Sequence, residues 1–287
     1  YGAAGISHDP DLTRLLLERG ADPNDGETDY HAPEGFDNRA MMVIAESGKL
    51  TPDGFTTMLV RKLDWTDYDG ASWLLDHGSS ANETGKWGNR PLDQALARCS
   101  RIEFFTLLLD HGGNPLLTSK DGVTAFTRSA RVGRNDVLDL FGQRGIASDI
   151  SGDDKLLEAC ARGDSDNARV MVAADPGIVS RIEARSPSVI AEFAGAGNVD
   201  GLRLLLDLGF SMESQTRVAQ SPGLNALQLA VWRERIDVVK LLLERGADPA
   251  APNRRGQTAR SLALRAQSEG SEWTPHESKE ILRLVGG

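Results

Sequence analysis

Residues 15–24 read LLLERGADPN, and residues 241–249 repeat the phrase as LLLERGADP. Related phrases stand between them, WLLDHGSSAN at 73–82, LLLDHGGNP at 107–115 and LLLDLGF at 204–210. Each is an apolar run, a few polar residues and a glycine. The glycines are Gly20, Gly48, Gly78, Gly112, Gly145, Gly209 and Gly246, with Asp175 in the remaining slot. Their intervals of 28, 30, 34, 33, 30, 34 and 37 residues predict a stacked array of helical units.

Each apolar run is expected to be a helix that packs against neighbours, because a run such as Leu107 to Leu109 is too apolar for a solvated face. The glycine that follows suits a helix end in the left-handed conformation. His77 and His111 precede their glycines, where an imidazole can bond the last carbonyls of the helix. Trp73 lies within such a run and is expected in the core.

A second phrase lies about 20 residues before each glycine, as in DGVTAFTRSA at 121–130 and RGQTARSLA at 255–263. Asp-Gly or Arg-Gly indicates a tight turn. Thr28, Thr124 and Thr258 offer an oxygen to cap the short helix that follows. Small residues such as Ala95, Ala130 and Ala230 then allow close helix packing. One unit is therefore a turn, a short helix, a loop, a leucine-rich helix and a glycine stop.

This unit resembles the ankyrin repeat, whose pattern is roughly G-x-T-P-L-H-x-A-A, a polar loop and V-V-x-L-L-L-x-x-G-A-D. The closest matches are residues 223–249 and 121–145. No unit keeps the full T-P-L-H, residues 25–50 are short, and Asp175-Pro176 replaces the usual glycine, so irregular geometry is expected there. The resemblance implies an all-α solenoid of stacked helix-turn-helix units with short β-turn or hairpin connections.

Residues 1–287 are predicted to form a single ankyrin-repeat array of nine units. Their approximate bounds are 1–24 (partial), 25–50, 51–84, 85–118, 119–149, 150–184, 185–218, 219–252 and 253–287, the last a C-terminal cap. The first unit begins inside its own short helix, so the natural N-terminus is expected further upstream.

Composition narrows the class of protein. No run of 18 apolar residues exists, so no membrane span is expected. Cys99 and Cys160 fall in different units and are expected to be reduced, which fits a cytoplasmic protein. Arg outnumbers Lys 25 to 7, which favours a bacterial source. The net charge of −10 disfavours nucleic-acid binding.

The charge is concentrated at one end. Residues 1–85 hold sixteen Asp/Glu against six Lys/Arg, a net of −10, and the rest of the chain is neutral. This acidic block is either a solvated surface or a patch for a basic partner. Within it, Asp64, Asp67 and Asp69 are interpreted as a helix-opening cluster, since the segment lacks the ligands of a calcium loop. Residues 151–154, SGDD, are interpreted in the same way.

Ankyrin-like arrays bind through turn tips and the ends of the short helices, on the concave side. Counting within each unit places seven Trp and Arg residues there: Trp65, Trp87, Arg98, Arg131, Arg162, Trp232 and Arg233. We call this set the Trp/Arg surface. Trp and Arg are enriched at interface hot spots, so the surface is predicted to bind an acidic or mixed segment of another protein. The alternative is that these arginines pair with acidic side chains of neighbouring units.

Familiar catalytic motifs are absent, with no GxSxG, P-loop, HExxH or paired CxxC. No catalytic residue, cofactor, metal site, nucleic-acid or small-molecule partner is therefore predicted. The leading interpretation is a non-enzymatic module that binds another protein on its concave face. Two alternatives stay open: the recognition region of a larger enzyme or effector, and an inhibitor or immunity-type protein that blocks its partner.

Overall fold

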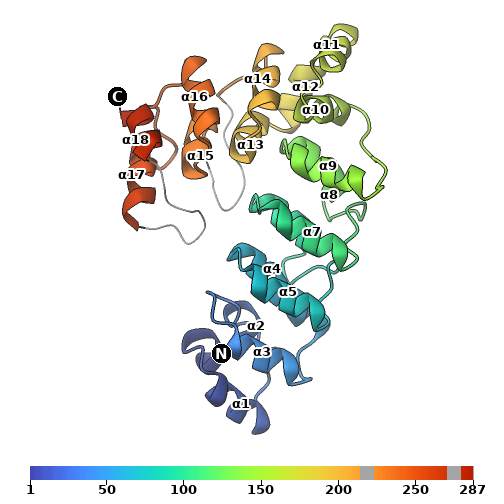
Figure 1. The fold of residues 1–287 in the computed structure, drawn as a ribbon, viewed down its shortest axis with the longest axis vertical. Coiled ribbons are helices and arrows are strands. Elements are labelled where there is room, and N and C mark those ends of the chain that lie inside the picture. The colour runs from blue at the N-terminus through green and yellow to red at the C-terminus, as the bar shows by residue number, and fades with distance from the viewer. Residues whose placement is uncertain (214–222, 270–278, 287) are drawn as a thin grey trace. The chain divides into compact units, whose positions relative to one another are not determined.

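The computed structural model describes residues 1–213, 223–269 and 279–286 (Figure 1). Their regular secondary structure consists of helices, and an isolated β-bridge joins Thr118 and Thr124. The fold is therefore all-α, as predicted. The chain divides into two compact units, Tyr1–Ala125 and Phe126–Gly287. The prediction that one continuous array runs through both stays a prediction.

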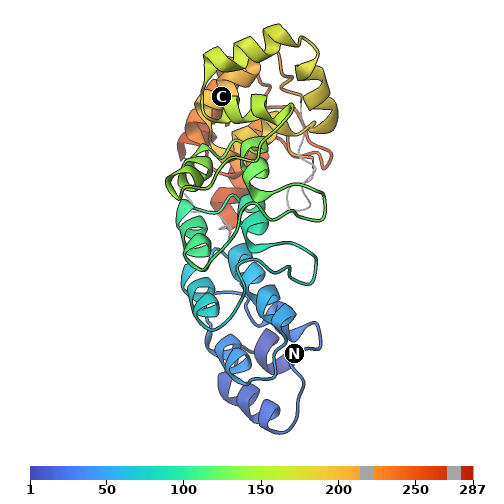
Figure 2. The same cartoon turned by 90° about the vertical axis from the view of Figure 1, so that its right-hand side faces the viewer.

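The first unit consists of helices in antiparallel pairs, each with a first helix at the position of the predicted short helix and then an outer one (Figure 1). We call the first helix of every pair the short helix, although α4 with 13 residues is longer than α5 with 9. The pairs are η1 (Gly2–Ile6) with α1 (Pro10–Glu18), α2 (Thr28–His31) with α3 (Arg39–Glu46), α4 (Pro52–Asp64) with α5 (Tyr68–Asp76), and α6 (Pro91–Ala97) with α7 (Ile102–Asp110). Short helices stack on short helices, α2 on η1 and α4, and α4 on α6. The connections before the short helices project to one side (Figure 2).

The second unit repeats this arrangement from α8 (Ala125–Arg131), which spans the boundary. Its helices are α9 (Asn135–Gln143), α10 (Asp154–Ala161), α11 (Ser165–Ala174), α12 (Ile178–Arg185), α13 (Val189–Ala196), α14 (Val199–Asp207), α15 (Ala226–Trp232), α16 (Ile236–Glu244), α17 (Ala259–Glu269) and α18 (Lys279–Gly286). The short helix α15 packs between α13 and α17, and the outer helix α16 packs between α14 and α18. Helix α12 is an additional helix that belongs to no such pair.

The predicted glycine stops are confirmed. Gly20, Gly48, Gly78, Gly112, Gly145, Gly209 and Gly246 all have positive φ, between 68° and 103°. A Cβ at any of them would meet nothing within 4 Å, so the backbone conformation, and not lack of space, requires glycine. At the slot without a glycine, Asp175 has a φ of −141°, and α12 follows directly.

Small and leucine-rich positions form the core as expected. Ala95, Ala130 and Ala230 are fully buried, and so are Leu108 and Leu242. Asn225 caps α15 in a capping box with Gln228. Thr258 caps α17 by accepting from the Ser261 backbone N–H at 3.1 Å, as predicted.

Three local predictions are wrong. Thr28 does not cap α2; it is the first helical residue, and the Asp25 carboxylate accepts from both its backbone N–H and its hydroxyl. Trp73 is half-buried and stacks on His77 at 3.8 Å between ring centroids, because it lies on the flank of α5. Leu15 and Leu16 on α1 are exposed, since no helix packs over them in the described structure.

In the described residues no helix is long and apolar enough to cross a membrane.

Candidate protein-interaction surface

The Trp/Arg surface occupies equivalent positions within the repeats. Trp65, Arg98, Arg162 and Arg233 are the residues immediately after α4, α6, α10 and α15. Arg131 and Trp232 are the last residues of α8 and α15, and Trp87 lies in the connection before α6. The repeat counting therefore located the ends of the short helices correctly. Three of the residues fall in the first unit and four in the second.

Trp87 is the most exposed of the three tryptophans, with 46% of its surface accessible. Its ring meets the Tyr30 ring of α2 edge-on, with centroids 4.8 Å apart. The Arg61 guanidinium lies 4.0 Å from the centre of the Tyr30 ring, and Lys86 Nζ lies 5.5 Å from the Trp87 ring. The exposed Trp87 ring is therefore held between the Tyr30 ring and one cation, Lys86, and Arg61 supports Tyr30 from its own side. Trp65 is half-buried at the end of α4.

Arg98 forms an ion pair with a carboxylate of the neighbouring repeat. Its Nε donates to Asp64 Oδ1 at 2.6 Å, and Arg61 Nη1 donates to Asp64 Oδ2 at 2.7 Å. Gln94 donates to the same carboxylate from α6. Asp64 is buried, so it serves as the acceptor of an inter-repeat network and not as a helix cap. This supports the structural alternative for Arg98.

The next carboxylate, Asp67, caps α5 as predicted, accepting from the Gly70 backbone N–H at 3.0 Å. It also pairs with Lys62 Nζ at 2.8 Å, and that ammonium donates to the Gly35 carbonyl. Lys62 is fully buried, and this burial lowers its pKa. Sequence reasoning missed Lys62 because the helix periodicity gives no signal that a lysine points inward.

In the second unit, Arg131 and Arg162 also form ion pairs. Nε and Nη2 of Arg131 donate to the two oxygens of Asp154, at 2.9 and 2.8 Å, and Arg185 donates to the same carboxylate at 2.7 Å. Residues 151–154 open α10 as predicted, with Asp153 at the N-cap position and Asp154 in the first turn. In the described part of the chain no side chain caps the start of this helix by a hydrogen bond, and Asp154 accepts from the two arginines. Arg162 Nη1 pairs with Asp139 at 2.8 Å while staying exposed.

Trp232 and Arg233 end α15, and both are half-buried. They lie beside α13, whose Gly195 backbone approaches so closely that a Cβ there would meet an Arg233 nitrogen at 2.8 Å. Burial raises the pKa of the Glu192 carboxyl on α13, and the charge of Arg233 opposes that rise. This end of α15 therefore combines an aromatic ring with a positive charge.

The histidine prediction is confirmed. Nδ1 of His77 lies 2.7 Å from the Trp73 carbonyl, and Nδ1 of His111 lies 2.9 Å from the Leu107 carbonyl. The hydrogen bond from His111 Nε2 to Asp76, at 3.0 Å, raises the His111 pKa. These imidazoles bond the last turns of α5 and α7.

Sequence reasoning also missed a link between repeats at Asn198. Its Nδ2 donates to the Gly133 carbonyl at 2.8 Å and to the Ala161 carbonyl at 2.7 Å, while Oδ1 accepts from the Gly201 backbone N–H. One side chain therefore joins the turns of three successive helix pairs. The only signal in the sequence is an asparagine immediately before a helix, which indicates a cap and gives no hint of the other two bonds.

The described residues contain no group of His, Cys, Asp or Glu arranged to hold a metal. Both cysteines are free, and burial raises the pKa of the Cys160 thiol to about 12, so this thiol stays protonated at neutral pH. The Trp/Arg surface offers aromatic rings and guanidinium groups, with carboxylates beside them, and such groups can make noncovalent contacts with another molecule.

Repeated helix pairs, tied by side chains that reach from one pair to the next, define a helical-repeat protein. More narrowly, residues 156–253 match the family described as ankyrin repeats (3 copies). An ankyrin repeat-containing protein of Treponema pallidum (strain Nichols) is 29% identical over 141 residues, 48% of this chain and 46% of that protein. This chain thus spans about half the length of that relative.

Among solved structures, the ankyrin repeat domain of Bcl-3, a member of the IkappaB family, is similar over 96% of this chain and 97% of its own. Its sequence identity is 16% and its TM-score 0.36. Ankyrin repeats are generally protein-interaction modules and are typically non-enzymatic, which is the class of function that the family indicates.

Proposed function

We propose that this chain is a non-enzymatic, cytoplasmic bacterial module that binds another protein on its concave face through the Trp/Arg surface. The family supports protein binding as the class of function. The absence of known catalytic motifs in the sequence supports a role without chemistry of its own. A few anchor residues on this surface would supply most of the binding energy, and the surrounding contacts would exclude water.

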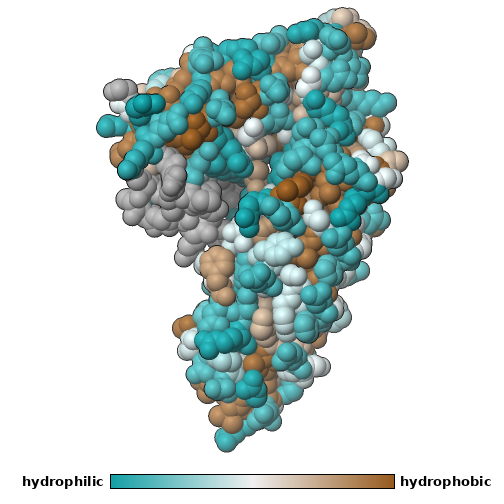
Figure 3. Space-filling model, viewed as in Figure 1, coloured by the Kyte–Doolittle hydropathy of each residue, from teal (hydrophilic) through white to brown (hydrophobic). Residues whose placement is uncertain are grey.

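The observation that carries the proposal is the arrangement around Trp87. A large aromatic ring stays exposed although its edge contact with Tyr30 and the nearby Lys86 hold it in place. An anchor held in its bound orientation loses little conformational freedom on binding, which favours affinity. Figure 3 shows one face of the molecule, on which hydrophilic residues predominate and apolar residues form separate patches.

Not all seven residues contribute equally under this proposal. Arg98 and Arg131 are held by Asp64 and Asp154, so their guanidinium groups have fewer donors left for a partner. Trp87 and the exposed Arg162 have the most accessible surface. We therefore infer that the tryptophans are the main anchors and that Arg98 and Arg131 chiefly hold neighbouring repeats together.

The test uses the full chain as bait in native lysate, followed by the affinity of the captured partner measured by calorimetry. The variant is Trp65→Ala, Trp87→Ala, Trp232→Ala, and each single change is also measured. We expect Trp87→Ala to weaken binding by about 2–4 kcal/mol, the range of a hot-spot residue. Phe36→Ala is the matched control, because Phe36 is an aromatic residue of the same unit, 63% exposed and outside the surface.

Unfolding curves accompany each variant, so that loss of binding is separated from loss of folding. A partner lost with Trp87→Ala and kept with Phe36→Ala supports the proposal. Equal affinity for parent and triple variant would place the site elsewhere, with the acidic residues 1–85 as the next surface to test.

A further inference from the structure

Helix α11 is packed unlike the outer helices α14 and α16. Its only extensive helix contact is with α10, whereas α14 and α16 pack against one another. Of its ten residues only Ala168 is buried, and Val170 is 66% exposed. The cause is local: Asp175-Pro176 and the additional helix α12 take the place of the usual glycine stop. Arg181 of α12 bonds both Asp153 and Asp175, which holds the insertion in place.

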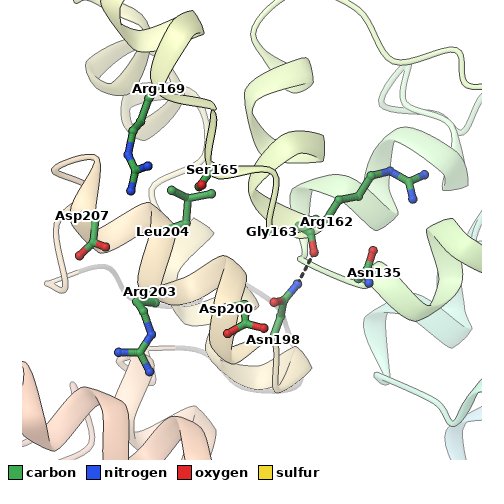
Figure 4. Close-up of a pocket in the computed structure, with 11 residues that line it drawn as sticks. Asn135, Arg162, Gly163, Ser165, Arg169, Asn198, Asp200, Arg203, Leu204 and Asp207 are labelled. Carbon is green, nitrogen blue, oxygen red and sulfur yellow. Dashed lines mark hydrogen bonds between the residues drawn. The ribbon is translucent and has the colours of Figure 1, made fainter. Parts of the chain in front are cut away.

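The space left beside α11 is a hollow of about 380 Å³, which we call the α11–α14 groove (Figure 4). Its lining includes Asn135, Arg169, Asn198, Arg203, Leu204 and Asp207. Its volume is in the range of sites for small ligands or single side chains, roughly 300–1,000 Å³.

One end of the groove is held by hydrogen bonds, and the lining is mostly polar with Leu204 as its one large apolar side chain. Asn198 forms that end, and its three hydrogen bonds to Gly133, Ala161 and Gly201 leave its carboxamide fully engaged. Leu204 is buried between the helices. Figure 4 shows Arg169 reaching from α11 toward Leu204 and Asp207. The Arg162 side chain is engaged elsewhere, with Asp139 and Glu158.

Some charged side chains around the groove have ion-pair partners among the described residues, and others do not. Arg203 forms no hydrogen bond or ion pair with the described residues, and the nearest carboxylate to Arg169, that of the exposed Asp166, is 3.9 Å away. Asp207 is already neutralised by Arg245 at 2.8 Å. Asp200 lies in the first turn of α14, where the helix dipole favours a negative charge. Two guanidinium groups therefore face the groove with most of their donors unused.

An acceptor also lies unused at the opposite end. Asn135 Oδ1 is buried and has no hydrogen-bond partner in the described structure, while Nδ2 of the same carboxamide donates weakly to Asp139 at 3.3 Å. A buried acceptor without a partner is costly, so a ligand N–H at this position would be favoured.

We propose that the α11–α14 groove binds an acidic peptide segment of a partner protein. One Asp or Glu carboxylate of the segment accepts from Arg169 and a second accepts from Arg203, which points away from Arg169 (Figure 4), and a backbone N–H of the segment donates to Asn135. Guanidinium groups suit carboxylates because they offer paired N–H donors in one plane. The groove is lined by the turns of the repeats and by outer helices, so this site is independent of the Trp/Arg surface, with which it shares only the backbone of Arg162.

The probe is a fluorescein-labelled ten-residue peptide of alternating Glu and Gly, titrated with the full chain at near-physiological salt and followed by anisotropy. The variant is Arg169→Glu, Arg203→Glu. Arg255→Glu is the control, because Arg255 is an exposed arginine of the same unit outside the groove. We expect the double variant to bind at least about tenfold more weakly, the loss of one or more charged hydrogen bonds, and the control to bind as the parent does.

Two further measurements distinguish the possible reasons why the peptide binds. Glutarate as a competitor tests for a site that takes any small carboxylate, and a Lys–Gly peptide tests for attraction by the acidic surface. Circular dichroism of each variant reports folding. Three results would overturn the proposal. The Arg255→Glu control could lose as much peptide affinity as the double variant, or glutarate could displace the peptide with the same affinity as the peptide itself. The parent protein could also fail to bind the peptide. Asn135→Leu is a second variant that changes no charge, and weaker peptide binding by it supports the position of the backbone contact.

Discussion

Arg98, at the end of α6, donates through Nε to the Asp64 carboxylate at the end of α4, 2.6 Å away across neighbouring repeats. An arginine at the predicted binding position is thereby used to hold two repeats together. The same carboxylate also accepts from Arg61, so one buried negative charge is shared between two cations.

Removing this charge should destabilise the protein more than removing any one cation. Asp64→Asn removes the carboxylate shared by Arg61 and Arg98, although Arg61 keeps its pair with Glu34 at 2.7 Å. We therefore expect a loss of about 3 kcal/mol in the free energy of unfolding, the lower end of the cost of breaking a buried pair. Arg98→Ala should cost less, about 1–3 kcal/mol. Urea unfolding of the full chain measures both. Arg162→Ala, which breaks an exposed pair with Asp139, is the control at about 0–1 kcal/mol, and an equal loss in all three variants would contradict the network.

Burial within the outer helices sets the cost of losing a leucine. Leu108→Ala and Leu242→Ala each remove a fully buried side chain, so we expect losses of about 2–5 kcal/mol in unfolding free energy. Leu15→Ala removes the same atoms from a residue that is 43% exposed and should cost well under half as much. Thermal or urea unfolding measures the three changes. Unchanged stability in both core variants would be incompatible with stacked helices.

Two glycines three residues apart on and after α9 should respond in opposite directions. Gly145 has a φ of +71°, and Gly142 is helical, while a Cβ at either meets nothing within 4 Å. Gly145→Ala should therefore cost about 1–2 kcal/mol through backbone strain alone. Gly142→Ala should stabilise by about 0.5–1 kcal/mol, because alanine loses less entropy in a helix. Melting temperatures that shift in the same direction would contradict the left-handed stop.

The bond between His111 and Asp76 makes part of the stability depend on pH. The pKa of His111 is raised in the folded protein, so its stabilising contribution is complete below the unfolded value of about 6.5 and is lost as the pH rises through the folded value. We expect His111→Gln to lose stability relative to the parent at pH 5–6 and to approach it at higher pH. Unfolding curves across this range measure the effect.

An NMR titration gives an independent measurement of the same contact. The His111 midpoint should fall in Asp76→Asn, because that hydrogen bond is the largest cause of the raised pKa. A midpoint unaffected by the substitution would show that the Leu107 carbonyl, and not Asp76, controls the titration.

The repeat unit was predictable from the sequence because its signals are local. Apolar runs, Asp-Gly turns and glycine stops each act within one or two helical turns, so the ends of the short helices, including Arg98, Arg162 and Arg233, were located by counting. The capping histidines were predictable for the same reason, since each bonds a carbonyl four residues earlier.

The tertiary structure decided what those residues contact. Partners of Arg98, Lys62 and Asn198 lie on other segments, up to 65 residues away for the bond from Asn198 to Gly133, and no periodic pattern specifies which side chains meet across repeats. The groove beside α11 likewise depends on how an inserted helix packs. The sequence determined the repeat and its helices by short-range physics, whereas only packing between repeats decided which charges are neutralised and which remain available to a partner.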